Sequence, residues 1–285
     1  MTGYSIWTLC FARAEVSSDF VGGSPVASNR GTVEIPMAFS VIASAPGNSR
    51  RLIAVDCGFR SGESMSGRKF ANFEMPEAVL GKIGFSPAEV DTLILTHLHF
   101  DHAGNVGAFP NARIYVQRRE YEQWRQVLRE IPDLTPGKRL WALSSLNPED
   151  FDVLDREIAG GRVHFLDGDA EIAPGISCRH AAESHTFGSQ WIAVDTGSGP
   201  CVIASDCVYS YANIERMWPP GYLQGNPWNL MRVFKQINSL VGGDFMRVVP
   251  GHDMGVFQRR PSWTLGRNPV AEVNLASGET SRQRP

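Results

Sequence analysis

An α/β fold is predicted by two features of the sequence. Segments with the pattern of strands alternate with helical segments along most of the chain, and residues 92–96 form a continuous apolar run typical of a strand buried on both faces. The 285 residues, of which 42% are hydrophobic, are enough to build one large core. We therefore expect a single domain over residues 1–275.

The N-terminal third predicts the antiparallel start of a sheet. Its strand-like segments are rich in Val, Ile and Phe and are separated by clusters of Gly, Ser, Pro and Asn; they are residues 4–12, 36–45 and 51–56. Pro76 suits the first turn of a helix, and Val79, Leu80 and Ile83 share one face. A helix is therefore predicted over residues 76–83.

The rest of the chain continues the alternation. A strand over 113–117 leads into a helix over 118–130, and prolines then interrupt the pattern between 131 and 161, where we expect an inserted cap beside a pocket. The later predicted strands are 163–166, 176–180, 190–195, 201–205 and 246–249, and an amphipathic helix is predicted over 230–241. The polar tail, residues 276–285, is expected to be flexible.

Composition argues against several classes of partner. The net charge is −3 and no run of Lys and Arg occurs, so we expect neither nucleic-acid binding nor attraction to a membrane. No stretch reaches the roughly 20 apolar residues that span a bilayer. The five cysteines are an odd number without paired spacing, which favours reduced, buried thiols and a cytoplasmic location. The expected partner is a small molecule.

The most informative motif is THLHFDHAGN at residues 96–105. Three histidines and one aspartate fall within six positions, directly after a predicted strand, where active-site loops commonly lie; they are His97, His99, Asp101 and His102. His97 and His99 point to the same side of an extended chain, and the other two continue around the turn. One loop can therefore offer ligands to two adjacent metal ions. Imidazole and carboxylate suit zinc, and also iron or manganese.

The pattern H-x-H-x-D-H after an apolar strand resembles the motif of the metallo-β-lactamase superfamily. The resemblance runs from about Asp56 to His252 and implies a four-layered αββα sandwich, in which two mixed β-sheets are flanked by helices. It also implies three later metal ligands, which are His185, Asp206 and His252. Asp56, at the end of a predicted strand, matches an aspartate that supports the site without being a ligand.

By the same resemblance, two zinc ions are expected, with iron, manganese or cobalt as substitutes. The expected ligands of the first ion are His97, His99 and His185; those of the second are Asp101, His102 and His252; Asp206 bridges the two. The segment around His185 departs from the usual family form, because Glu183, Ser184, Phe187 and Ser189 stand where that form has prolines and a glycine-histidine pair. His164 and His180 are expected to be ordinary strand residues.

The implied activity is metal-dependent hydrolysis. Two such cations lower the pKa of water to about 7 or below, so that a metal-bridging hydroxide can attack a substrate carbonyl. The resemblance gives Asp101 a second role, as the carrier of a proton to the leaving oxygen. The substrate is then a small molecule with a hydrolysable carbonyl.

Three features resemble the N-acyl homoserine lactonase-like branch of the superfamily: the run THLHFDHAG, the late Gly-His-Asp, and Tyr209, three residues after Asp206. In that branch such a phenol points at the metal-bound oxygen, so Tyr209 is expected to be catalytic. Opening of a lactone ring is implied, with N-acyl homoserine lactones as first candidates, quorum quenching as the role and a homodimer as the assembly. Cys207 turns to the opposite face of an extended chain and is not expected to bind metal.

Other functions stay open at this point. The same fold serves hydrolases of cyclic amides, β-lactams and thioesters, and an iron-dependent sulfur dioxygenase that needs one metal. A non-catalytic binding protein would more naturally have lost a ligand, whereas every ligand position here is filled. The aromatic candidates to line a pocket are Phe20, Trp141, Trp218, Tyr222 and Trp228.

Overall fold

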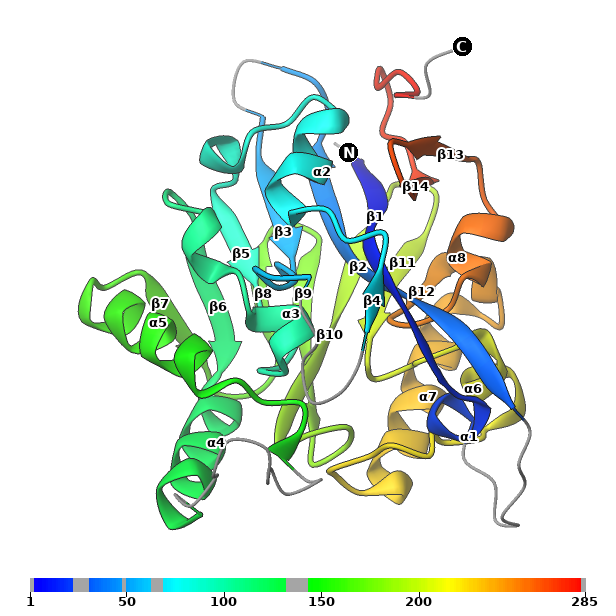
Figure 1. The fold of residues 1–285 in the computed structure, drawn as a ribbon. Coiled ribbons are helices and arrows are strands. Elements are labelled where there is room, and N and C mark those ends of the chain that lie inside the picture. The colour runs from blue at the N-terminus through cyan, green and yellow to red at the C-terminus, as the bar shows by residue number, and fades with distance from the viewer. Residues whose placement is uncertain (1–2, 23–30, 48–49, 63–68, 132–142, 283–285) are drawn as a thin grey trace.

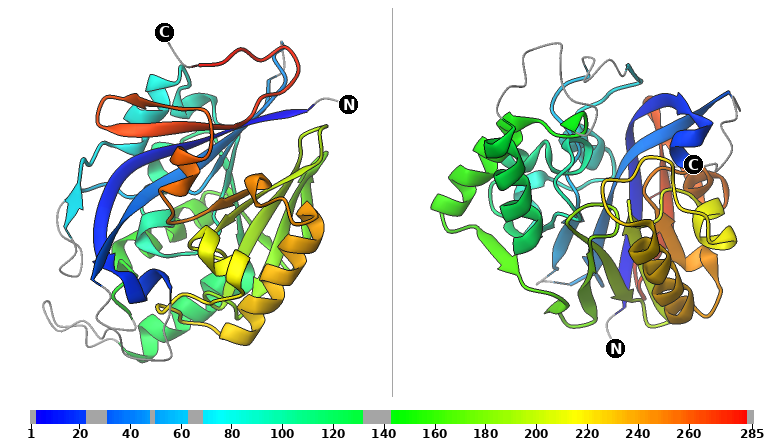
Figure 2. Two further views of the ribbon diagram at one scale, coloured as in Figure 1. Left: turned by 90° about the vertical axis from the view of Figure 1, so that its right-hand side faces the viewer. Right: turned by 90° about the horizontal axis from the view of Figure 1, so that it is seen from below.

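The computed structural model describes residues 3–22, 31–47, 50–62, 69–131 and 143–282. Two β-sheets lie face to face, and helices cover the outer face of each (Figures 1 and 2). In the right panel of Figure 2, α4 (Arg118–Glu130) and α5 (Pro148–Ala159), in green, lie on one side of the sheets and α7 (Pro227–Val241), in gold, lies on the other. The predicted α/β class and its four layers are confirmed.

The first sheet has the strand order β13-β14-β1-β2-β3-β5-β6-β7, with β4 paired to β1. Its strands are β1 (Tyr4–Ser17), β2 (Thr32–Ser44), β3 (Leu52–Val55), β4 (Phe70–Ala71), β5 (Thr92–Ile94), β6 (Arg113–Gln117), β7 (Val163–Leu166), β13 (Ser262–Leu265) and β14 (Asn268–Asn274). The neighbours from β3 to β7 are parallel and the other pairs antiparallel, so the sheet is mixed, as predicted.

The second sheet has the strand order β12-β11-β10-β9-β8. Its strands are β8 (Ala170–Ala173), β9 (Ile176–Ala182), β10 (Gly188–Asp195), β11 (Pro200–Ser205) and β12 (Val248–Pro250). Here β11 and β12 are parallel, and the remaining neighbours are antiparallel. The second sheet is therefore mixed as well.

The C-terminal hairpin formed by β13 and β14 was not predicted from the sequence. β14 pairs with β1, with Val270 opposite Leu9, so the hairpin extends the first sheet. Gly266, at φ +74°, turns the chain between the two strands in the left-handed region that suits glycine. The predicted strand at 246–249 is also different, because a 3₁₀ turn (Phe245–Arg247) precedes β12.

Apolar side chains fill the three spaces between the four layers. Residues from the inner faces of the sheets meet in the middle, among them Ile6, Ile53 and Ile192. The outer face of the first sheet packs against its helices through residues such as Trp7 and Phe11, and that of the second sheet packs against α7. Successive residues of β1 thus enter different cores, which explains why that strand is apolar on both faces.

The helices begin where the sequence offers a suitable first turn. α2 (Pro76–Lys82) has Pro76 as its first residue, α5 begins at Pro148, and the side chain of Asn147 accepts a hydrogen bond from the Glu149 amide. Three further short helices are α1 (Ser18–Val21), α6 (Tyr211–Arg216) and α8 (Gly255–Gln258). None of the helices in the described part of the chain has the length and apolar character needed to cross a membrane.

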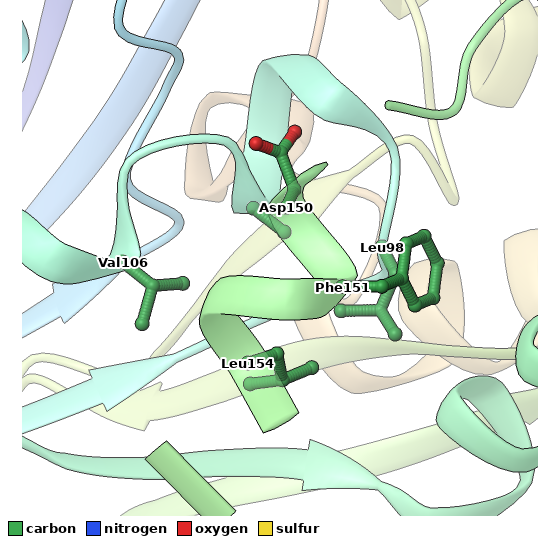
Figure 3. A pocket seen from close by; sticks show the side chains of 6 residues that line it. Leu98, Val106, Asp150, Phe151 and Leu154 are labelled. Atoms are coloured by element: carbon green, nitrogen blue, oxygen red, sulfur yellow. The ribbon is translucent and has the colours of Figure 1, made fainter. Parts of the chain in front are cut away.

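The expected cap and the polar tail are described in part. Of the expected cap, residues 132–142 lie outside the described residues, and α5 forms much of the remainder. Figure 3 shows a small pocket at α5, which Leu98, Val106, Asp150, Phe151 and Leu154 line. In the tail, the guanidinium of Arg282 lies over the rings of Trp7 and Phe85.

Candidate metal centre

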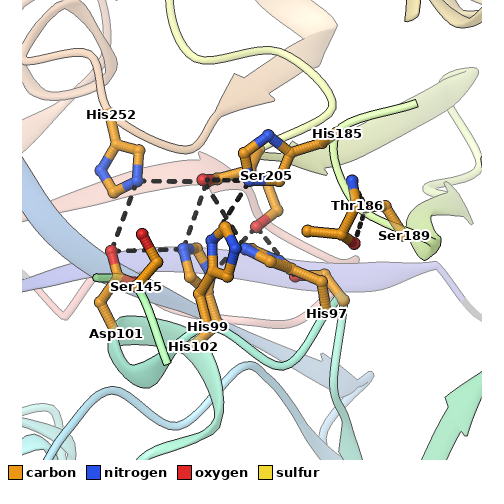
Figure 4. Close-up of polar contacts among 12 residues, drawn as sticks. His97, His99, Asp101, His102, Ser145, His185, Thr186, Ser189, Ser205 and His252 are labelled. Atoms are coloured by element: carbon orange, nitrogen blue, oxygen red, sulfur yellow. Dashed lines mark hydrogen bonds and ion pairs between the residues drawn. The ribbon is translucent and has the colours of Figure 1, made fainter. Parts of the chain in front are cut away.

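Seven side chains converge at one edge of the sandwich, where β5, β9, β11 and β12 end (Figure 4). They are His97, His99, Asp101 and His102 after β5, His185 between β9 and β10, Asp206 after β11 and His252 after β12. The short helix α3 (Phe100–Ala103) turns the chain directly after His99. The structure thus brings together every residue that the sequence suggested as a metal ligand.

The seven residues fall into two groups. Ligand atoms of His97, His99, His185 and Asp206 all lie within 4.8 Å of one another, and so do those of Asp101, His102 and His252. This division is the one expected from the sequence.

Asp206 directs one carboxylate oxygen toward the other members of the first group and the other oxygen toward the second group. Its Oδ2 lies 3.3 Å from His185 Nε2 and 3.7 Å from His97 Nε2. Its Oδ1 lies 3.2 Å from Nε2 of both His102 and His252. A carboxylate that bridges two ions needs this arrangement.

The donor atoms fit metal ions. His97 Nε2, His102 Nε2 and Asp206 Oδ1 are buried and have no hydrogen-bond partner among the residues that the structure describes. A buried polar atom left in this state costs about 1–3 kcal/mol, and a cation among these nitrogen and oxygen donors would remove that cost. Imidazole and carboxylate donors suit zinc, iron and manganese. We conclude that this is a His/Asp site of metal-binding type.

The other ring nitrogen of four histidines has a partner that orients the ring. The pairs are His97 Nδ1 with Thr96 Oγ1 at 3.1 Å, His99 Nε2 with Gln224 Oε1, His102 Nδ1 with Asp56 Oδ2 at 2.8 Å, and His252 Nδ1 with the Pro36 carbonyl at 3.1 Å. Such contacts fix which nitrogen is left to bind a metal.

Asp56 supports the site from behind, as the sequence suggested. It follows β3 with φ +66°, and its Oδ1 accepts a hydrogen bond from the Thr96 amide at 2.8 Å. Ser205 Oγ donates to its Oδ2 at 3.0 Å. Asp56 therefore joins the ends of β3, β5 and β11. It contacts His102 through Nδ1, the ring nitrogen that does not belong to the cluster of donor atoms.

The two groups differ in their electrostatics. Burial lowers the pKa of His185 to about 3 and that of His99 to about 4, which favours the neutral imidazole that binds metal. Burial also acts on His102, but Asp206 and Asp101 more than offset it and raise its pKa well above the usual value. The second group thus gathers negative charge that attracts a cation.

A small pocket opens onto the donors. His99, Asp101, Asp206 and His252 line its polar end, and Val16, Phe20, Ile35 and Met37 line an apolar wall. Ser145, Tyr209 and Tyr222 complete the lining. The lining of the pocket therefore combines polar metal donors with apolar side chains.

Tyr209 lies beside both groups of donors. Its ring centroid is 5.3 Å from that of His185 and 5.1 Å from that of His252. Elsewhere in the lining, the hydroxyls of Ser145 and Tyr222 lie 2.7 Å apart, and the Tyr222 ring stacks on Phe20. Three residues of the lining thus carry hydroxyl groups.

The remaining candidates differ in where they lie: two line the pocket, others are away from the donors, and one falls outside the described residues. Cys207 packs in the outer core of the second sheet, where burial raises its pKa. His164 stacks on Tyr115 on the first sheet. Of the aromatic candidates, Phe20 and Tyr222 line the pocket, Trp228 is 67% exposed, and Trp141 falls in the undescribed segment 132–142.

Several residues at the site were missed by the sequence analysis. Gln224, Ser145 and Pro36 contact the donors or line the pocket from segments without a motif. Thr96 and Ser205 gave a weak signal, because each directly precedes a predicted ligand.

Comparisons with known proteins agree with this geometry. A family model described as the metallo-beta-lactamase superfamily matches residues 48–252. An N-acyl homoserine lactonase from a Bacillus species is 32% identical over 142 residues, which is 50% of this chain and 48% of that protein. The N-acyl homoserine lactonase AttM of Azorhizobium caulinodans is 28% identical over 179 residues, 60% of this chain and 61% of that protein. The match thus spans only about half to three fifths of these relatives.

Solved structures share the fold. An N-acyl homoserine lactone hydrolase with the product N-hexanoyl-L-homoserine bound at its metal centre is 20% identical, with a TM-score of 0.70, over 92% of this chain and 98% of that one. The hydrolase AbOPH of the beta lactamase superfamily is 18% identical, with a TM-score of 0.64, over 96% of this chain and 98% of that one.

Proposed function

This chain belongs to the metallo-beta-lactamase superfamily, and we propose that it is a metal-dependent hydrolase that opens a small lactone ring. N-acyl homoserine lactones are the first candidates, with quorum quenching as the resulting role. The observation that carries the proposal is the position of Asp206, with one oxygen toward each group of donors, at the polar end of a pocket with an apolar wall. The names of the lactonase relatives support the choice of substrate.

The proposed cofactors are two zinc ions, which iron, manganese or cobalt could replace. His97, His99 and His185 would hold the first, Asp101, His102 and His252 the second, and Asp206 both. When bound, zinc lowers the pKa of a coordinated water to about 7 and polarises a carbonyl oxygen, which is the chemistry that ester hydrolysis needs.

Tyr209 is the proposed hydrogen-bond donor to the substrate. Its ring lines the pocket beside His185 and His252, and this position supports the phenol as the donor to a carbonyl group held near the donors. A fixed donor stabilises the negative charge that grows on the carbonyl oxygen as the ring opens.

Asp101 is the proposed proton carrier. Its Oδ2 lies 3.5 Å from His102 Nε2 and 3.6 Å from His252 Nε2, so the carboxylate stands among the donors. Opening a lactone leaves an alkoxide, and the Asp101 carboxylate can pass it a proton taken from the attacking water. The side chain also lines the pocket, which gives it access to the substrate.

The apolar wall of the pocket is evidence for a substrate that carries an apolar substituent. Val16, Phe20, Ile35 and Met37 come from β1, α1 and β2 and line the same pocket as the donors. Each buried methylene contributes about 0.8 kcal/mol, so an acyl chain against this wall would strengthen binding. The assembly that we propose is a homodimer, and the five free, buried cysteines support a cytoplasmic location.

The test is a panel of hydrolysis assays with zinc-loaded protein. Phenol red reports proton release from N-acyl homoserine lactones and simple lactones, and a β-lactam, a cyclic amide and a thioester are assayed beside them. We expect rapid release with lactones, loss of activity in His97→Ala, and unchanged activity in His164→Ala, a histidine on β7 outside the site.

The metal content is measured on the same samples. Two zinc ions per chain in the wild type would agree with the proposal. A single iron ion with oxygen consumption would replace hydrolysis by oxidation, and cleavage of the thioester or a lactam with every lactone intact would overturn the choice of substrate.

A further inference from the structure

A buried carboxylate that the proposed reaction does not use lies behind the first group of donors. Glu120, in the first turn of α4, is fully buried. Its Oε1 accepts hydrogen bonds from the Leu98 amide at 3.1 Å and the Trp124 indole at 2.8 Å. Its Oε2 accepts from Thr186 Oγ1 at 2.7 Å and the Gly188 amide at 2.6 Å.

Three of these donors belong to the loops that carry the histidines of the first group. Leu98 stands between His97 and His99, after β5 of the first sheet. Thr186 follows His185 directly, and Gly188 begins β10 of the second sheet. One carboxylate therefore connects ligands that come from different sheets.

The hydrogen atoms of this network can be assigned consistently. Ser189 Oγ accepts from the Thr186 amide at 3.0 Å and donates to Thr186 Oγ1 at 2.6 Å, which leaves the Thr186 hydrogen for Glu120 (Figure 4 draws the pair Thr186 and Ser189). All four partners of Glu120 then donate, so its side chain is an ionised acceptor. Ser189 is one of the residues that depart from the usual family motif, and here it orients Thr186.

The backbone at this point is held as tightly as the side chains. A Cβ on Gly188 would lie 2.5 Å from the Glu120 amide nitrogen, which is too close for any other residue. Glycine therefore allows β10 to approach α4 closely enough for the contact between Glu120 and Gly188. This close approach brings the start of β10 to the same carboxylate as Leu98.

We propose that Glu120 is a positioning residue that sets the distance of His185 from His97 and His99, and thereby the affinity of the first group for its metal ion. The inference rests on the proposed metal centre. Ligand distances at such sites tolerate deviations of only about 0.2 Å. Three histidines on two separate sheets can meet that tolerance only if the sheets are held together nearby, and Glu120 does this.

The test compares the metal affinities of Glu120→Gln and Glu272→Gln. Glutamine keeps the size of Glu120 but directs an NH₂ group at donors, whereas Glu272 is a buried carboxylate on β14 that accepts hydrogen bonds from Ser281 and Arg282, away from the donors. Zinc affinity is measured by competition with a chromophoric chelator. We expect Glu120→Gln to lower the affinity for one of the two zinc ions by about 10- to 100-fold. Glu272→Gln should bind both ions with the affinity of the wild type.

A combined variant assigns the weakened ion to the first group. In His97→Ala that ion is already lost, so adding Glu120→Gln should change the remaining affinity by less than about twofold. If Glu120→Gln does not fold, Thr186→Val removes one hydrogen bond to the same carboxylate and is judged by the same criterion.

The inference would be overturned if a folded Glu120→Gln protein bound both ions with wild-type affinity. An equal loss of affinity for both ions would overturn it too. Either result would leave Glu120 with a role in stability alone. Because the readout is metal affinity, a failure of every lactone to react would overturn the proposed substrate and leave this inference standing.

Discussion

Nδ1 of His102 lies 2.8 Å from Oδ2 of Asp56, and both side chains are buried. The contact orients the imidazole so that its Nε2 faces Asp206 and Asp101. The carboxylate also makes the imidazole a stronger metal ligand, because it stabilises positive charge on the ring.

Replacing Asp56 by asparagine should weaken zinc binding by about 10- to 100-fold. The amide lacks the charge that supports His102, although it can still accept a hydrogen bond from the Thr96 amide. Chelator competition measures the change, and Asp155→Asn, which alters a carboxylate paired with Arg125 on the surface of α4 and α5, is the control. Equal affinities in the two variants would contradict the role given to Asp56.

Replacing Tyr209 by phenylalanine should lower kcat for lactones by about 100-fold or more, since removal of one preorganised donor typically has an effect of that size. KM and zinc content should change little, because the ring stays in place. Tyr211→Phe is the matched control, since that hydroxyl contacts Val248 and Arg260 in the core. An unchanged kcat in Tyr209→Phe would remove the phenol from the mechanism.

Replacing Phe20 by alanine should weaken the preference for long acyl chains. The ring lines the pocket and stacks on Tyr222, with 5.1 Å between the ring centroids. We expect KM for a decanoyl homoserine lactone to rise by about tenfold, which corresponds to about 1.4 kcal/mol, with little change for an unsubstituted butyrolactone. An equal rise for both substrates would show that Phe20 acts on the structure of the site and not on the acyl chain.

Asp150 predicts a pH dependence of stability. Burial raises its pKa from 3.8 to about 6, although Arg60 lies 2.8 Å away (Figure 3 shows its place on α5). Between pH 4 and pH 6 the folded state therefore binds a proton that the unfolded state has lost, and stability falls as the pH rises across this window.

The comparison of wild type with Asp150→Asn isolates this effect, because other titrating groups cancel. Relative to the variant, the free energy of unfolding of the wild type should fall by about 2 kcal/mol between pH 4 and pH 6. Urea titrations at closely spaced pH values measure it. A difference that does not change with pH would show that Arg60 keeps Asp150 ionised throughout.

Local pattern was enough to predict much of the fold. The strand over 113–117 and the helix over 118–130 have the predicted bounds, because their apolar periodicity is strong. The hairpin β13–β14 was missed, since its stability comes from pairing with β1 at the other end of the chain. Strand 246–249 was predicted with the wrong start, because a 3₁₀ turn interrupts its apolar residues.

The sequence by itself determined which donors the site contains. His97, His99, Asp101 and His102 lie in one short loop, so their proximity follows from chain connectivity alone. Only the tertiary structure decided how the oxygens of Asp206 divide between the two groups, and that Glu120 and Gln224 stand behind the histidines. These contacts join residues far apart in the chain, and their geometry depends on how the two sheets pack, which no local pattern encodes.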